Sequence, residues 1–148
     1  MNNDSHRQDL RREWYRLDNA ATLFSLITSP SNTCLFRIEA ELKRPVVLKN
    51  LQRALDNIIE RFPYYRVHLV PGLFWHFWNT SGAKPLVIAD TNDNCEVMPV
   101  TKPGIFPFRV RAFRNRVAME FHHSLTDGTG GMIFVKALLA EYLALSGT

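Results

Sequence analysis

The stretch from Val47 to Phe62 constrains the fold more than any other part of the chain. Apolar residues recur in it at spacings of three and four, which places them on one face of a helix. They are Leu48, Leu51, Leu55, Ile58, Ile59 and Phe62. Pro63 follows directly, and proline lacks an amide donor and disfavours helical geometry in the residue before it. We therefore predict a helix over 47–62 whose apolar face needs a second layer to cover it.

Most of the other patterned segments show the two-residue period of β-strands. In 33–42, Phe36, Ile38, Ala40 and Leu42 alternate with Arg37, Glu39 and Glu41, as in a half-buried strand. Further strands are predicted at 65–70, 73–78, 86–88, 106–113 and 116–122. Pro71-Gly72 and Arg114-Asn115 are the expected turns. A second amphipathic helix is predicted over 129–145, ending near Ser146-Gly147.

This order of elements predicts a mixed α/β fold of the α+β kind. Its centre is a mostly antiparallel or mixed sheet, and helices flank that sheet. A length of 148 residues fits a single domain. Residues 1–13 are polar and charged, so we expect a flexible N-terminal arm followed by one lobe over 14–148. A short helix around Leu23–Ile27 is expected to end at Ser29-Pro30.

Composition excludes several classes of protein. A hydrophobic content of 46% with 22% charged residues indicates a packed globule. No apolar run approaches the roughly 20 residues of a membrane helix, and no secretion signal follows the polar N-terminus, so we expect no membrane span. Cys34 and Cys95 form neither a disulfide framework nor a CxxC pair. We therefore expect inert thiols and a cytoplasmic location.

Binding to nucleic acid normally requires a clustered basic face. Here the formal charge is only +4, and the basic residues are dispersed instead of forming a run. Arg109, Arg111, Arg114 and Arg116 do cluster, at alternating strand positions around a turn. A solvated sheet face is the simpler interpretation, with a phosphate-binding patch as the alternative. We expect no nucleic-acid partner.

Residues that could do chemistry gather between Val117 and Gly128. Strand alternation places Phe121 and His123 on one face and Glu120 and His122 on the other, so we expect His123 on the buried side. Because neighbouring strand residues diverge, the two histidines cannot easily hold one metal ion, and no other histidine completes a ligand pattern. We expect no metal site and no bound cofactor, with a metal hydrolase as an alternative. Taken alone, a histidine pair fits a structural role or proton transfer.

The segment His122-His123-Ser124-Leu125-Thr126-Asp127-Gly128 is similar to the HHxxxDG signature of the chloramphenicol acetyltransferase-like superfamily. That superfamily includes peptide-synthetase condensation domains and alcohol acetyltransferases. The segment Arg61–Leu69 resembles their RHExLRTxF motif, with both arginines kept and Phe62-Pro63 in place of the His-Glu pair. The segment Tyr15–Ala21 is similar to the opening of the alcohol acetyltransferase branch. The chain thus resembles the N-terminal lobe of such an acyltransferase.

The resemblance implies a role for each residue of the motif. His123 is the general base that takes a proton from an alcohol or amine, which then attacks an acyl thioester of coenzyme A or of a carrier. Asp127 is structural and pairs with an arginine, for which Arg66 is the candidate. Gly128 permits backbone geometry, or a close approach of another group, that a Cβ forbids. His122 supports the loop. No residue for binding coenzyme A is identified.

The resemblance covers the first of two lobes, and the second lobe's DFGWG-type motif is missing. The implied partners are therefore a C-terminal lobe or further copies of the chain, as in chloramphenicol acetyltransferase trimers. The alternative function is a non-catalytic binding or interaction module that keeps the lobe fold. The aromatic cluster Phe74, Trp75, Phe77 and Trp78 fits hairpin packing, with the lining of an acyl chain as the other possibility.

Overall fold

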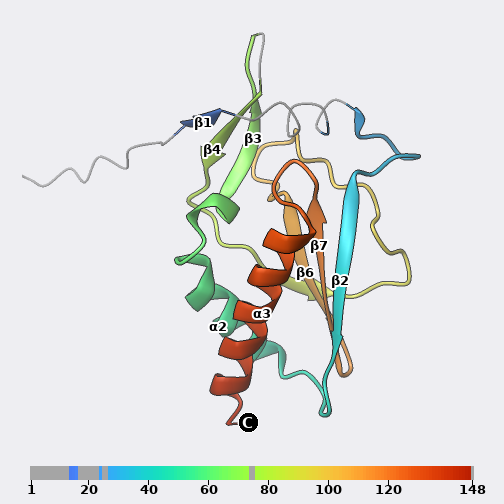
Figure 1. Cartoon of the computed structure of the whole chain (residues 1–148), viewed down its shortest axis with the longest axis vertical. Coiled ribbons are helices and arrows are strands. Elements are labelled where there is room, and N and C mark those ends of the chain that lie inside the picture. The colour runs from blue at the N-terminus through green and yellow to red at the C-terminus, as the bar shows by residue number, and fades with distance from the viewer. Residues whose placement is uncertain (1–13, 17–23, 25–26, 74–75, 148) are drawn as a thin grey trace, which may run out of the picture.

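The structure is a computed structural model that describes residues 14–16, 24, 27–73 and 76–147 (Figure 1). Its elements in chain order are β1 (Trp14–Arg16), β2 (Leu35–Glu41), α2 (Leu48–Ile59), the 3-10 turn η1 (Pro63–Tyr65), β3 (Val67–Pro71), β4 (His76–Thr80), β5 (Val87–Ala89), β6 (Phe108–Phe113), β7 (Arg116–His122) and α3 (Gly128–Leu145). The predicted arm over 1–13 and most of the predicted helix around 23–27 lie outside the described residues.

The larger sheet has the strand order β2-β7-β6-β5. The pairs β2–β7 and β6–β7 are antiparallel, and β5 runs parallel to β6. Helices α2 and α3 lie side by side in front of this sheet (Figure 1). The predicted mixed α/β fold, with a mixed sheet and flanking helices, is confirmed.

The predicted hairpin is confirmed, but it belongs to a second sheet. Strands β3 and β4 pair antiparallel, and β1 joins the free side of β4. The register pairs Pro71 with His76, so β4 begins three residues later than the predicted 73. Trp78 is buried with Val67 and Leu69, as expected for hairpin packing. Phe74 and Trp75 lie outside the described residues.

Most of the apolar stripe predicted for the first helix is buried against α3 and the larger sheet, but Leu48 at its start is 58% exposed. Leu51, Leu55 and Ile58 of α2 are fully buried in one cluster with Phe134 and Leu138 of α3. Each such side chain contributes roughly 1.5–3 kcal/mol when it leaves water. The helix ends at Ile59, slightly before the predicted boundary. This core joins both helices to the sheet.

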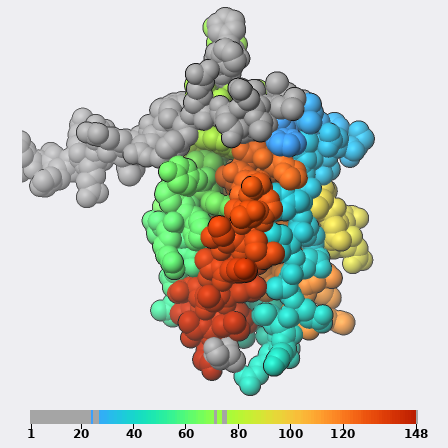
Figure 2. All heavy atoms as spheres, in the orientation of Figure 1, coloured from blue at the N-terminus to red at the C-terminus, as the bar shows by residue number. Residues whose placement is uncertain are grey.

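By length and composition α3 could cross a membrane, since its 18 residues have a mean hydropathy of 1.3. This differs from the expectation above that no apolar run approaches the length of a membrane helix. In the structure five of its residues are buried: Gly131, Phe134, Val135, Leu138 and Tyr142. Figure 2 shows the other side of α3, in orange to red, on the surface between α2 in green and β2 in cyan. The apolar character of α3 is therefore explained in part by its place in the core.

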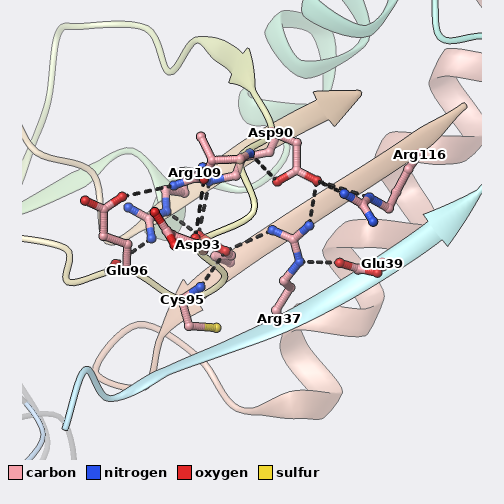
Figure 3. A network of polar contacts seen from close by, with 11 residues as sticks. Arg37, Glu39, Asp90, Asp93, Cys95, Glu96, Arg109 and Arg116 are labelled. Atoms are coloured by element: carbon pink, nitrogen blue, oxygen red, sulfur yellow. Dashed lines mark hydrogen bonds and ion pairs between the residues drawn. The ribbon is translucent and has the colours of Figure 1, made fainter. Parts of the chain in front are cut away.

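The face of the larger sheet away from the helices carries a buried ion-pair network around Glu120. Figure 3 shows Arg37, Asp90, Arg109 and Arg116 of this network. The Glu120 carboxylate binds the guanidinium groups of Arg37, Arg109 and Arg111, with Arg37 Nη1 at 2.9 Å and Arg111 Nε at 3.3 Å. It also accepts a hydrogen bond of 2.8 Å from the backbone N–H of Cys95. A carboxylate with this many partners can be buried at an acceptable cost.

Asp90 extends the network toward the edge of the sheet. Its Oδ2 lies 2.7 Å from Arg37 and 2.8 Å from Arg116. Segment 90–96 lies over this face, because Arg111 donates to Thr91 Oγ1 at 2.8 Å. The prediction of a solvated arginine face is therefore wrong for Arg109 and Arg111, whose side chains are 16% and 4% exposed. The covering segment is the reason.

Replacing Glu120 should destabilise the fold far more than replacing its exposed neighbour. Glu120→Gln removes the fully buried carboxylate that Arg37, Arg109 and Arg111 share, although Arg37 keeps its ion pairs with Asp90 and Glu39. We expect a loss of about 3–5 kcal/mol in the free energy of unfolding. Glu39 also pairs with Arg37 but is 40% exposed, so Glu39→Gln should cost under ~1 kcal/mol. Urea unfolding of both variants measures the difference. Equal losses would contradict the central role of Glu120.

Candidate functional site

His122 ends β7 and is fully buried. Its Nε2 lies 2.8 Å from Thr28 Oγ1, and its Nδ1 lies 2.6 Å from Ser124 Oγ. Thr28 already donates its hydroxyl proton to the carbonyl of Phe24, at 2.7 Å, so it can only accept from the imidazole. His122 therefore carries its proton on Nε2, and Nδ1 accepts from Ser124. Every polar atom of this buried ring has a partner.

Burial of His122, together with repulsion from the neighbouring His123 ring, lowers its pKa to about 4. The imidazole is thus neutral throughout the ordinary working range of pH. A ring that is enclosed, neutral and fully hydrogen-bonded is suited to holding structure together, as the resemblance implied. It has no open position for a substrate.

His123 is exposed, contrary to the predicted burial. Its backbone N–H still bonds to the carbonyl of Cys34 at 2.8 Å, so the chain is in strand register at this point. The ring lies between two phenyl rings, with centroid distances of 5.1 Å to Phe24 and 4.8 Å to Phe36. Alternation does set it on the helix side with Phe121, but the sheet ends here and one side of the ring meets solvent. An exposed, aligned imidazole is what proton transfer to a substrate requires.

Asp127 begins α3 as its N-cap. Its Oδ1 accepts a hydrogen bond of 2.8 Å from the N–H of Gly130, which satisfies one of the free donors at the helix start. The predicted partner does not reach it, because the Arg66 guanidinium binds Glu60 at 2.9 Å. The Arg66–Asp127 ion pair is therefore a wrong prediction. In the described structure Asp127 fixes the loop by capping.

The close contact expected at Gly128 is found instead at Gly130 and Gly131. A Cβ on Gly128 would meet no atom within 4 Å. On Gly130 it would lie 2.2 Å from Thr126 Oγ1, and on Gly131 it would lie 2.9 Å from the Phe36 ring. The close approach of α3 to β2 therefore depends on Gly131. The prediction for Gly128 as a site of close backbone approach is wrong.

No group of three or more His, Cys, Asp or Glu side chains that could hold a metal ion occurs among the described residues. A hollow of about 590 Å³ is lined by Phe113, Arg114 and Arg116, among others. These residues lie at the opposite end of β7 from the histidines, roughly 20 Å away at the usual rise of a strand. The hollow is thus separate from the histidine site.

Searches for relatives in sequence matched neither a family model nor a curated protein. Solved structures do match. A variant of the starter condensation domain of rhizomide synthetase RzmA has a TM-score of 0.73 at 14% identity over 91% of this chain and 38% of that chain. The X-domain in complex with OxyB from teicoplanin biosynthesis has a TM-score of 0.72 at 16% identity. That match covers 99% of this chain and 36% of the other chain.

Polyketide synthase associated protein 5 from Mycobacterium tuberculosis also matches, with a TM-score of 0.63 at 18% identity over 90% of this chain and 33% of that one. Another structure of the RzmA starter domain is a complex with C8-CoA. It matches with a TM-score of 0.71 at 15% identity, over 91% of this chain and 37% of that one. The chain spans about a third of the length of these structures, from 33% to 38%. The likeness shows that the chain has the fold of a condensation-domain lobe, as the motif predicted.

The capping role of Asp127 predicts that the fold tolerates asparagine at this position much better than alanine. Asn caps a helix as well as Asp does, so Asp127→Asn should change the free energy of unfolding by only a few tenths of a kcal/mol, whereas Asp127→Ala should lose about 1 kcal/mol. An ion pair would be lost in both variants. Chemical denaturation of the two proteins separates these roles, and an equal loss in both would restore the ion-pair interpretation.

The buried neutral His122 predicts a stability that falls with acid. Because the folded pKa is about 4 and the usual value is 6.5, only the unfolded chain takes up the proton between these values. The free energy of unfolding should therefore drop by up to about 1.4 kcal/mol per pH unit as the pH falls through this window.

The ring protons of His122, followed by NMR, test this directly. They should keep their neutral-form chemical shifts from pH 8 down to 5. A titration midpoint near 6.5 would show that the ring is not enclosed as described.

Proposed function

We propose that this chain carries the general base of a thioester-dependent acyltransferase. The observation that supports the proposal best is the exposed imidazole of His123, aligned between Phe24 and Phe36 where β7 gives way to α3. The likeness in fold to a starter condensation domain solved with C8-CoA supports the choice of a thioester donor. The HHxxxDG-like segment supports the choice of His123 within that fold.

In the proposed reaction a ring nitrogen of His123 takes the proton from an alcohol O–H or amine N–H as the acceptor attacks the thioester carbonyl carbon. The C–O or C–N bond forms, the C–S bond breaks, and the leaving thiolate takes the proton back from the imidazolium. Such a base commonly contributes ~10²–10⁴ to the rate. No bound cofactor takes part, since the thioester is a co-substrate.

His122 and Asp127 support this base without touching the acceptor. His122 closes the end of β7, and Asp127 starts α3 three residues after Ser124. In this proposal the second wall of the acyl and acceptor sites comes from a C-terminal lobe or from another copy of the chain. The working location we propose is the cytoplasm.

Free thiol release from acetyl-CoA, in the presence of a panel of primary alcohols and amines, tests the proposal. His123→Ala should lower the initial rate by about 10²–10⁴. His76→Ala, which changes a histidine of β4 in the other sheet, is the matched control and should keep the rate. Equal rates for the wild type and His123→Ala would remove His123 as the base.

A non-catalytic binding module is the second candidate function. The similar X-domain was solved as a complex with another protein, OxyB, and among the residues that the structure describes Arg66 pairs with Glu60 and not with Asp127. This candidate predicts no thiol release above the uncatalysed rate with any acceptor. It also predicts that His123→Ala binds a partner as well as the wild type does.

A further inference from the structure

His122 and His123 are connected through space as well as through their shared peptide bond. Resting on the proposed function of His123, we propose that Phe24 is a positioning residue for that base and that the buried His122 holds Phe24 in place through Thr28. The two adjacent histidines then act in series, one as an anchor and the other as the group that reacts.

The anchor is a long-range contact. His122 Nε2 donates to Thr28 Oγ1 at 2.8 Å, across a separation of 94 residues in the chain. Because Nε2 carries the proton, the contact is a directed hydrogen bond and not an incidental approach. Burial keeps the ring neutral, so the bond persists over the pH range in which an acyltransferase works.

Thr28 passes this constraint to Phe24. Its hydroxyl donates to the Phe24 carbonyl at 2.7 Å, the back-bonding pattern that Thr side chains make to a residue four positions earlier. The Phe24 ring then stacks on His123 with an angle of 27° between the planes. A centroid distance of 5.1 Å lies within the range of favourable stacked ring pairs.

Phe36 restrains His123 in a different way. It belongs to β2, where it pairs with Phe121 of β7, and its ring also stacks on the Phe121 ring at 5.3 Å. Its position therefore depends on the sheet. The position of Phe24 depends on a hydroxyl, and this makes Thr28 the place where the orientation of His123 can be changed without altering the sheet.

An exposed side chain at the end of a strand would otherwise sample several rotamers, and a base must hold one direction to meet its proton. The ring pair confines the imidazole while leaving part of it open to solvent. Misplacement by about 1 Å can cost roughly 10² in rate. The hydrogen bond between His122 and Thr28 thus controls the orientation of the His123 ring.

NMR of the His123 ring protons tests the proposal without any assay of turnover. Thr28→Val removes both hydrogen bonds at nearly constant shape, and Thr28→Ser keeps the hydroxyl. In Thr28→Val the His123 ring protons should lose the shift caused by the Phe24 ring and move toward the position in Phe24→Leu. Thr28→Ser should keep the wild-type shifts.

Ile27→Ala is the matched control, because Ile27 is 42% exposed and makes none of these contacts in the described structure. Its His123 shifts should stay at the wild-type values. Wild-type shifts of His123 in a folded Thr28→Val would overturn the proposal. If Thr28→Val does not fold, Thr28→Ala decides instead by the same shifts, since it also lacks the hydroxyl and adds no bulk.

In the acetyl-CoA assay the same variants separate positioning from binding. Thr28→Val should lower kcat about 10²-fold with KM nearly unchanged, and Thr28→Ser should restore kcat. If the wild type shows no turnover, the proposed function fails, while the NMR shifts still decide whether His122 and Thr28 orient His123. A Thr28→Val enzyme with wild-type kcat would overturn the positioning role.

Discussion

The central position of β7 is the constraint on which the rest of the structure depends. It lies between β2 and β6, and six of its seven residues, from Val117 to His122, are buried. One face meets the helices through Met119 and Phe121, and the other meets segment 90–96 and its surroundings. A strand buried on both faces cannot leave a polar side chain unpartnered, because each such group would cost about 1–3 kcal/mol or more. The arginines around Glu120 and the hydroxyls around His122 are therefore requirements of this position.

Periodicity was sufficient to predict the elements. The three- and four-residue spacing in α2 and the alternation in β2 both reflect a single covered face, and both elements form close to the predicted boundaries. The assumption that only one face of a strand is covered failed for β7. Alternation identifies which residues share a face, but it does not say whether the second face is exposed to solvent. The least patterned part of the chain, 79–104, supplies that cover, so the buried arginines could not be predicted from their own segment.

The candidate site shows the same limit. The motif directed attention to the corner from His122 to Gly128, yet Arg66 binds Glu60 instead of Asp127, and Gly131 carries the close contact that Gly128 does not make. Both outcomes follow from three-dimensional proximity that spacing cannot measure. One local signal was available: an Asp followed three residues later by the N–H of Gly130, at the start of an apolar helical pattern, is a typical helix N-cap. Among the described residues, the cap hydrogen bond from Gly130 is the contact that holds the Asp127 carboxylate.

Adjacent residues on a strand must point to opposite faces, and this gives a pair of histidines a use that a single one lacks. His122 turns into the fold, where burial makes it neutral and its hydrogen bonds fix a segment distant in sequence. His123 turns to the side where the sheet ends and a part of its ring remains open. The opposite directions that disfavour a shared metal ion would also divide support from reactivity between the two histidines, as proposed above. Because both side chains leave the same backbone, any strain that moved the proposed anchor would also move the proposed base, and in that proposal the hydroxyl of Thr28 limits the movement from outside the strand.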